Sequence, residues 1–382
     1  MAQPLLCLNL YASVGGAERA LLELLPALDP ARYAPLAVLG SEGPLAVALR
    51  ERGASVVIEP FPTPPLWRLA WPPALLHVRA AARRIGRLAQ SRGVRLVQCG
   101  DVLGLLLLGP AVAAGAGLVY QVNYLGSGPR LVLLRALAGR IGAVVACSRF
   151  QADQIARDAP GLAARTVVVH PGIDAAAFAS GDGAPFRREI AVAEGAPLVG
   201  MLARYDVWKG HDVFLEAAAR LAAARPELRF AMIGGALNAA ALPHVARYRE
   251  AILARRQALG LGDRVKVVDH RADVKSALHA LDVVVMPSRG EPFGMALLEA
   301  MAAGKPVVAS DSGGPAEIVE DGRSGRLFRT GDAVALAAAL GAVLDDAGAA
   351  RRMGDAGRER VFALFGRERY ARAMQEVYGR LA

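Results

Sequence analysis

With 382 residues, the chain is long enough for two domains, each with its own hydrophobic core. Hydrophobic residues make up 54% and charged residues 21%, which excludes a disordered chain and is typical of soluble globular proteins. The formal net charge of +10 is compatible with a nucleic acid, an anionic membrane or phosphorylated ligands as partners. Aromatic residues are only 5% and are not interleaved with basic ones, so we expect no nucleic acid partner.

The first predicted element is an apolar strand over residues 5–10, and the pattern AERALLELLPAL that follows predicts a helix. Gly15 and Gly16 stand between them, where glycine lets the backbone approach a ligand at a helix N-terminus. The pair does not match G-x-G-x-x-G, and by spacing alone we favour a tight turn without a ligand. The N-terminus has no basic start, so we expect no secretory signal and a cytoplasmic protein.

Short apolar runs continue through the first half and alternate with amphipathic helical patterns, which is typical of a parallel α/β sheet. The runs predict strands over 33–39, 54–58, 95–99, 118–122, 143–147 and 165–169. Cys7, Cys99 and Cys147 lie in or beside such runs and have no metal-ligand spacing, so we interpret them as free thiols of a reducing compartment.

One stretch without charge, residues 102–122, is long enough to span a membrane as a helix. Gly104, Gly109, Pro110 and two further glycines interrupt it, and GLVYQV at its end is typical of a strand. We therefore predict a buried helix, a turn and a strand rather than a membrane span.

A basic amphipathic helix is predicted over ALLHVRAAARRIGRLAQSRG, just after Trp67 and Trp71. Its arginines are Arg79, Arg83, Arg84 and Arg87, opposite Leu76, Ala80, Ile85 and Leu88. Such a helix can lie on the inner face of an anionic membrane, which would make the protein peripheral. A solvated arginine face on the surface of a domain is the interpretation we prefer.

The segment ASGDGAPFRREIAVAEGAP, residues 179–197, is polar and marked by Gly and Pro, so we interpret it as an interdomain linker. Alternation then resumes, with strands predicted over 197–202, 229–233, 265–268 and 283–286 and three helices from residue 332 onward. Arg204 and Lys209 lie in a loop after a strand and before a helix. Two cations in that position suit a diphosphate, although surface cations are common in a chain this basic.

Residues 286–317 form the most informative stretch of the chain. An apolar strand leads into the loop SRGEPFG and the helical pattern MALLEAMAAG. Glu291 lies in the loop and Glu299 in the helix, and Phe293 and Gly294 stand at the helix N-terminus, which attracts an anion. Because Glu299 has apolar neighbours on both sides, we expect it to hold a ligand rather than to face solvent.

This E-x7-E stretch resembles the retaining glycosyltransferases of family GT4, and the likeness continues for some thirty residues beyond it. The phrases AVVACSRFQADQI and VVVHPGIDAAAF, the R-x4-K element from Arg204 to Lys209 and the loop at Gly15 and Gly16 are also similar to that family. The resemblance implies that Glu291 contacts the donor sugar, that Glu299 binds the nucleotide ribose, and that Arg204 and Lys209 neutralise the leaving diphosphate.

The fold that the resemblance implies is α/β GT-B, with two Rossmann-like parallel-sheet domains facing each other across a deep cleft. We expect an acceptor domain over 1–176, completed by a crossover helix at 366–382, and a donor domain over 177–365. The implied catalytic residues are Glu291, Arg204 and Lys209. The implied donor-binding residues are Glu299, Gly15, Gly16, Phe293, Gly294, Met295 and Arg271, the last in a loop that holds the base largely through its backbone.

The activity implied is metal-independent transfer of a sugar, with retention, from a UDP- or GDP-sugar to an acceptor hydroxyl in cell-envelope glycan, glycolipid or secondary-metabolite biosynthesis. No D-x-D occurs, so we expect no metal or other cofactor and assign charge compensation to Arg204, Lys209 and the helix N-terminus. The acceptor could be a sugar, a lipid-linked glycan or a small molecule.

One departure from the family lies where many members have a histidine near the reacting centre. Here the phrase is YQVNY, and Asn123 can hydrogen-bond a sugar hydroxyl but cannot carry a proton. His211, His244 and His279 are more typical of packing or surface histidines. An alternative function is therefore a non-catalytic nucleotide-binding or membrane-associated GT-B module; the elements of GT-B epimerases and phosphorylases are not found.

Overall fold

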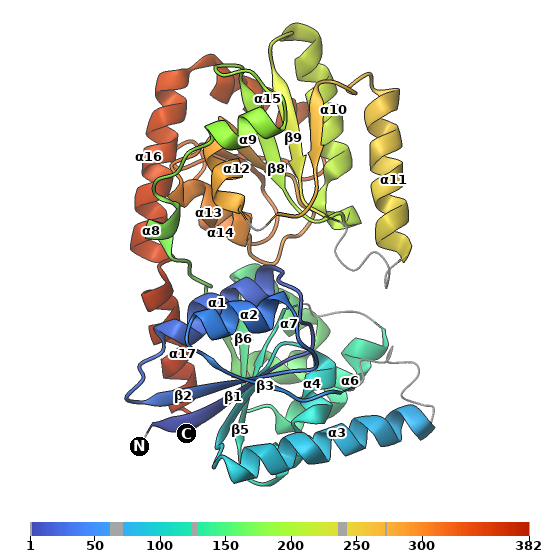
Figure 1. Cartoon of the computed structure of the whole chain (residues 1–382), viewed down its shortest axis with the longest axis vertical. Helices are drawn as coiled ribbons and strands as arrows, with labels where there is room; N and C mark the ends of the chain where they lie inside the picture. Colours follow the sequence, from blue (N-terminus) through green and yellow to red (C-terminus); the bar gives the residue numbers. More distant parts are fainter. Residues whose placement is uncertain (1, 62–71, 124–127, 236–242, 272, 382) are drawn as a thin grey trace. The chain divides into compact units, whose positions relative to one another are not determined.

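The computed structural model describes residues 2–61, 72–123, 128–235, 243–271 and 273–381, so Trp67 and Trp71 lie outside the described residues. The chain divides into two compact units (Figure 1). Unit 1 contains residues 1–172 together with 367–382, and unit 2 contains residues 173–366.

Unit 1 is built on a parallel sheet that has seven strands within the described residues, in the order β3-β2-β1-β4-β5-β6-β7. The strands are β1 (Gln3–Asn9), β2 (Tyr33–Leu39), β3 (Ser55–Ile58), β4 (Leu96–Cys99), β5 (Gly117–Gln121), β6 (Ala143–Ala146) and β7 (Thr166–Val168). Along β1, Leu5 and Cys7 enter one hydrophobic core while Leu6 and Leu8 enter another, as the two-residue period of a strand requires. The sheet is therefore buried on both faces, which explains its continuous apolar runs.

Helices cover both faces of this sheet (Figure 1). They are α1 (Gly16–Ala27), α2 (Pro44–Glu51), α3 (Pro72–Ser91), α4 (Val102–Leu107), α5 (Gly109–Ala113), α6 (Pro129–Leu137), α7 (Arg149–Asp158) and α17 (Arg367–Gly379), with short 3-10 turns η2 (Ala138–Arg140) and η3 (Pro160–Arg165). The uncharged stretch at 102–122 forms α4, α5 and β5, so the prediction of buried helix, turn and strand is confirmed.

The basic helix α3 forms as expected, but its buried face was assigned incorrectly. Val78, Ala81, Ile85 and Ala89 are buried, whereas Leu76 is 63% exposed. The buried positions recur at intervals of three and four residues, so they form one face of the helix. Small alanines lie on this packed face, whereas the larger side chain of Leu76 lies outside it. Arg84 donates to a Glu59 carboxylate oxygen and to the carbonyl of Pro60, and the other three arginines are exposed.

The last helix, α17, belongs to unit 1 although unit 2 precedes it in the chain. Tyr370, Met374 and Tyr378 on α17 are buried in the core that also contains Leu5 and Cys7. Tyr378 donates a hydrogen bond to Gln98 of β4, and Gln121 of β5 donates to the Tyr370 hydroxyl at 2.9 Å. These buried polar groups fix α17 against the sheet, because an unpaired one would be costly.

Unit 2 is built on a parallel sheet with six strands within the described residues, in the order β10-β9-β8-β11-β12-β13. Its strands are β8 (Leu198–Leu202), β9 (Arg229–Ile233), β10 (Val265–Val268), β11 (Val283–Met286), β12 (Val307–Ser310) and β13 (Arg326–Phe328). Its helices are α8 (Ala175–Phe178), α9 (Ala184–Glu189), α10 (His211–Ala224), α11 (Pro243–Ala258), α12 (Val274–Ala280), α13 (Met295–Ala302), α14 (Pro315–Ile318), α15 (Ala333–Asp345) and α16 (Ala347–Leu364), with a 3-10 turn η4 (Val207–Lys209).

The interpretation of residues 179–197 as a linker is wrong. This segment packs within unit 2, where Phe186 is fully buried on α9. A Cβ on Gly183 would lie 2.4 Å from the backbone nitrogen of Ala280, so the segment is pressed against α12. Its first Gly and Pro residues form the turn before the short helix α9 and the first turn of that helix. The chain passes from one unit to the other between Gly172 and Ile173.

Among the described residues, no single helix is long and apolar enough to cross a membrane. The helices α15 and α16 pass that test only as a pair, with a bend of 103° between them.

Candidate active site

Two buried glutamates follow β11 in unit 2. Glu291, in the loop after the strand, is 7% exposed, and Glu299 on α13 is 3% exposed. The Glu291 loop is held firmly, because its carbonyl accepts from Gly314 N–H at 2.8 Å and the Ser288 hydroxyl donates to its Oε2 at 3.0 Å. A buried carboxylate needs such donors, and this loop supplies them.

Lys209 completes this group. Its Nζ lies 2.6 Å from Glu291 Oε2, with side-chain exposures of 15% for the lysine and 10% for the glutamate. The same ammonium lies 3.9 Å from the centre of the Trp208 ring. The β8–α10 loop and the β11–α13 loop therefore meet at a shielded ion pair, which follows from the pairing of β8 with β11 in the sheet.

Arg204 has a different environment from Lys209. Its side chain is 51% exposed, and its guanidinium lies 3.4 Å from Asp206 and 5.9 Å from the centre of the Trp208 ring. Both cations therefore flank one indole ring, with Lys209 shielded and Arg204 open to solvent. A half-exposed guanidinium on a short loop can turn toward an anion at little energetic cost.

Sequence reasoning missed a third cation, Arg289, which ties the two loops together. Its backbone N–H donates to Trp208 O at 2.6 Å, and its guanidinium donates to both carboxylate oxygens of Asp212 at 3.0 and 2.7 Å. A bidentate pair of this kind fixes orientation as well as distance. Arg289 stands next to the predicted loop residues, but spacing along the chain gives no sign of a partner 77 positions away.

The N-terminus of α13 begins at a glycine and is flanked by buried side chains. Gly294 has a φ of +120°, and a Cβ there would lie 3.2 Å from Met286 Sδ, so glycine is needed. Phe293 is 4% exposed and packs against Phe365, and Met295 is 9% exposed. A ligand at this helix start would therefore meet amide groups and the helix dipole rather than these two side chains.

Arg271 lies after β10, and its side chain is directed to α9. Its guanidinium donates to both Glu189 oxygens at 3.0 Å and lies 4.7 Å from the centre of the Phe186 ring. It therefore holds α9 to this loop, and the predicted contact with a nucleotide base depends on the loop backbone.

His211 is a packing residue, as predicted. It is 1% exposed, stacks on Tyr205 at 4.6 Å and meets the edge of Tyr248 at 5.9 Å. Burial, with a smaller effect from the nearby Lys209 charge, lowers the pKa of His211 to about 4. The imidazole is therefore neutral at pH 7 and supports the loop that carries Lys209.

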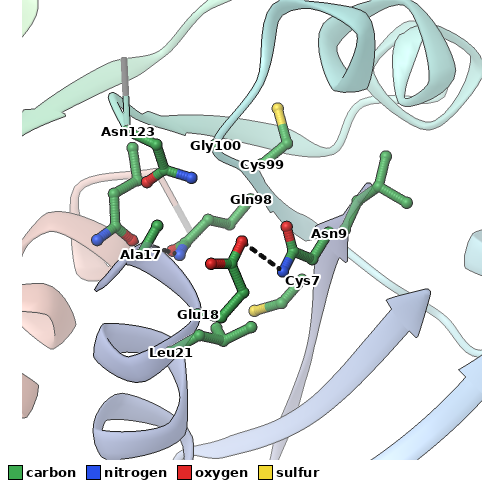
Figure 2. A pocket seen from close by; sticks show the side chains of 11 residues that line it. Cys7, Asn9, Ala17, Glu18, Leu21, Gln98, Cys99, Gly100 and Asn123 are labelled. Carbon is green, nitrogen blue, oxygen red and sulfur yellow. Dashed lines mark hydrogen bonds between the residues drawn. The ribbon is translucent and has the colours of Figure 1, made fainter. Parts of the chain in front are cut away.

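In unit 1, one of the residues predicted to contact a ligand, Asn123, borders a cavity (Figure 2), whereas Gly15 and Gly16 do not line it. It is a small cavity of about 30 Å³ that is partly open to solvent. Gly15 precedes α1 and Gly16 is its first residue. Gly15 N–H donates to Glu18 Oε2 at 3.0 Å, and Asn9 Nδ2 donates to Glu18 Oε1 at 3.3 Å.

Glu18 is a charged residue of this cavity that sequence reasoning did not single out. It is 9% exposed, and its carboxylate accepts a hydrogen bond from the backbone just before α1. A glutamate three residues after the position that precedes a helix is the signal that could have identified it. Among the described residues, no group of three or more His, Cys, Asp or Glu side chains is arranged to hold a metal ion.

Two family models match the chain, one to each half. Residues 14–177 match the model described as Glycosyltransferase Family 4, and residues 184–360 match the model described as Glycosyl transferases group 1.

Similar proteins include a D-inositol 3-phosphate glycosyltransferase of Nocardia farcinica, 35% identical over 194 residues, which is 50% of this chain and 42% of that protein. A lipopolysaccharide core biosynthesis mannosyltransferase, LpcC of Rhizobium leguminosarum, is 34% identical over 216 residues, 56% of this chain and 60% of that protein. The chain spans about half the length of the curated relatives it matches.

Solved structures match over the whole length. Anabaena Alr3699/HepE in complex with UDP and glucose has a TM-score of 0.85 and 25% identity, covering 99% of each chain. The same protein in complex with UDP-glucose has a TM-score of 0.83. Sucrose-phosphate synthase from Thermosynechococcus elongatus has a TM-score of 0.82, 23% identity and 99% coverage of each chain, a likeness of fold alone.

Proposed function

The chain belongs to glycosyltransferase family 4 and has the GT-B fold, and from this we propose that it transfers a sugar from a nucleoside-diphosphate sugar to an acceptor hydroxyl. The observation that carries the proposal is the shielded pair of Lys209 and Glu291 at the strand-end edge of unit 2. Lys209 offers three donors and Glu291 uses one, so two remain for phosphate oxygens. The Anabaena protein is in complex with UDP and with UDP-glucose in its solved structures, which supports a UDP-sugar donor here, with a GDP-sugar as the second candidate.

In the proposed reaction, the acceptor oxygen forms a bond to the anomeric carbon as the bond from that carbon to the phosphate oxygen breaks. Negative charge then develops on the leaving diphosphate, which Lys209, Arg204 and the amides at the start of α13 would stabilise. The proton of the acceptor hydroxyl would pass to the leaving phosphate. Retention of configuration and independence of a metal ion are part of this proposal.

The two acids and the remaining residues take positioning roles. Glu291 would accept hydrogen bonds from donor sugar hydroxyls and Glu299 from the ribose, as the family resemblance implies. Phe293, Gly294 and Met295 would set the start of α13, and the loop of Arg271 would hold the base. Gly15 and Gly16 would contact the donor, and Asn123 would contact the acceptor or the sugar. We further propose that the transfer is a step in glycan biosynthesis. The Rhizobium relative, a lipopolysaccharide core biosynthesis mannosyltransferase, supports this proposal.

The test is a panel of nucleotide-sugars read by thermal shift, because a ligand that binds the folded state raises the melting temperature. We expect one UDP- or GDP-sugar to raise it, also in the presence of a chelator. Steady-state transfer or donor hydrolysis should then fall about 100-fold in Lys209→Ala, while Lys275→Ala on α12 stays near wild type. A panel without any shift or turnover would refute the proposal.

The second candidate function is a nucleotide-binding or membrane-associated module without catalysis. Asn123 in the unit 1 cavity and the exposed arginines of α3 favour it. Equal single-turnover release of sugar by wild type, Glu291→Ala and Lys209→Ala would support the module. Sedimentation with anionic vesicles, repeated after reversal of the charges at Arg79, Arg83 and Arg87, tests the membrane contact separately.

A further inference from the structure

We propose that the unit 1 cavity binds an acceptor that carries hydroxyl groups and no phosphate, and that Glu18 enforces this choice. The inference rests on the glycosyl transfer proposed above, because it defines the chemical class of the second substrate. It is carried by the chemistry of the residues that line the cavity (Figure 2).

The cavity is built from the carboxyl ends of neighbouring strands. Asn9 ends β1, Gln98 lies in β4 and Gln121 ends β5, and the first turns of α1 bring Glu18 to the same place. Because these strands are adjacent in the sheet, their side chains converge on one point. The opening therefore lies where ligands bind in parallel α/β sheets.

Glu18 is fixed in this cavity. Asn9 donates to its Oε1 at 3.3 Å and Gly15 N–H donates to its Oε2 at 3.0 Å. A carboxylate has about four acceptor positions, so these two bonds leave about two for a ligand. Groups that donate a hydrogen bond, such as sugar or cyclitol hydroxyls, can use them.

The other polar side chains of the cavity are amides, from Asn9, Gln98, Gln121 and Asn123. The two glutamines already bond to each other and to tyrosines of α17. The two asparagines are therefore the amides left for a ligand hydroxyl, which an amide can meet as donor or as acceptor. The two thiols remain neutral, because burial raises the pKa of Cys7 to about 12 and raises that of Cys99 as well. The lining thus presents one carboxylate among neutral groups.

A phosphate would meet this lining without a counter-charge. Among the described residues that line the cavity, none carries a positive charge. Arg130 on α6 does not line it and pairs with Asp101 at 3.0 Å. Placing a dianion beside a fixed, largely buried carboxylate is unfavourable, since like charges in a shielded site are poorly screened.

The start of α1 lies beside this carboxylate. A helix N-terminus commonly binds phosphate through its free amides and its dipole. Here the backbone N–H of Gly15, just before the helix, donates to Glu18. A phosphate group of the acceptor that approached this end of the helix from the cavity would therefore lie close to the Glu18 carboxylate.

The experiment compares matched neutral and phosphorylated polyols: myo-inositol with D-inositol 3-phosphate, glucose with glucose 6-phosphate, and mannose with mannose 6-phosphate. Transfer from the donor found in the panel is measured as kcat/KM. We expect the neutral member of the accepted pair to be preferred by about 100-fold or more. Equal kcat/KM for both members would overturn the proposal.

Binding is measured in parallel by ligand-observed NMR, and it does not depend on turnover. Because the chain has a net charge of +10, phosphorylated compounds will also bind elsewhere, so the readout is the change caused by Glu18→Gln. This variant should bring the affinities of a pair at least tenfold closer. Asn123→Asp, which adds a second carboxylate, should move them further apart.

Unchanged ratios in both variants, with melting temperatures near wild type, would overturn the proposal, as would a failure of every neutral polyol to bind. If the chain neither binds nor hydrolyses any nucleotide-sugar, glycosyl transfer fails while the binding ratios still judge the cavity. If donor hydrolysis proceeds but phosphorylated polyols bind the cavity best, only the present inference fails.

Discussion

The ion pair between Lys209 and Glu291 should stabilise unit 2 as well as serve its chemistry. At 2.6 Å, an effective dielectric constant of about 20 gives an attraction of about 6 kcal/mol. Much of this is offset, because both side chains lose water when they become 85% and 90% shielded, as their exposures of 15% and 10% imply. Removing one partner leaves the other charge buried, so each single replacement should cost about 3 kcal/mol.

A double-mutant cycle separates these contributions. Lys209→Met and Glu291→Gln are made singly and together, and the double variant should lose less than the sum of the two, because neither charge then remains buried. We expect a coupling free energy of about 3 kcal/mol.

Urea unfolding followed by tryptophan fluorescence provides the measurement. Replacing Trp67 and Trp71 by phenylalanine leaves Trp208 as the single reporter, and its ring lies 3.9 Å from the Lys209 ammonium. The reporter therefore follows unit 2, which avoids treating a chain of two units as one transition. The exposed pair of Arg323 and Glu320 is the comparison and should show less than about 0.5 kcal/mol. A coupling equally small at Lys209 and Glu291 would refute the reasoning.

Three further predictions concern the support of this loop. Arg289→Ala, which removes the bond to Asp212, should raise KM for the donor about tenfold with a smaller change in kcat, measured by steady-state kinetics. His211 is neutral in the folded protein and takes up a proton near pH 6.5 when unfolded. Its contribution of about 3 kcal/mol to the free energy of unfolding is therefore complete above pH 6.5 and is lost as the pH falls toward 4. Urea unfolding of His211→Gln across this range should show a flatter pH dependence of that free energy. Gly210→Ala combines a φ of +73° with a Cβ 2.1 Å from Pro287 O, so it should lower the free energy of unfolding by more than about 2 kcal/mol.

Each of these variants has a matched control. Gly260 has a φ of +68° and an added Cβ would meet no atom within 4 Å, so Gly260→Ala reports backbone strain alone, about 1 kcal/mol. Gln90, which is exposed and has no titratable group, serves as the control for His211: Gln90→Ala should keep the wild-type pH dependence. Arg323→Ala should leave KM unchanged. Equal effects in a variant and its control would show that the proposed contact is not responsible.

The sheets were predictable from the sequence because buried parallel strands are continuous apolar runs. β2 was predicted at its observed residues, 33–39. β13 was missed because it has only three residues and begins with Arg326. The segment at 179–197 was misjudged, since Gly and Pro mark turns of packed short helices as well as free linkers.

The candidate site was predictable in part. Glu291 and Glu299 lie below the surface, as the apolar neighbours of Glu299 indicated. The contacts of Lys209 with Glu291 and of Arg289 with Asp212 join residues 82 and 77 positions apart. Spacing in the sequence carries no information about which loops meet; the strand order decides it, by placing β8 beside β11. Glu18 was passed over because a capping role and a ligand role give the same local pattern.

The return of α17 to unit 1 has a consequence for biosynthesis. Ribosomes deliver this chain from the N-terminus, so residues 1–172 emerge first, yet the helix that contributes Tyr370, Met374 and Tyr378 to their core is among the last to emerge. During the synthesis of nearly two hundred intervening residues, the part of the earlier-made core that α17 covers stays exposed to solvent. Chaperone engagement at that stage, and poor recovery of chains halted before residue 367, are what this order of assembly leads us to expect.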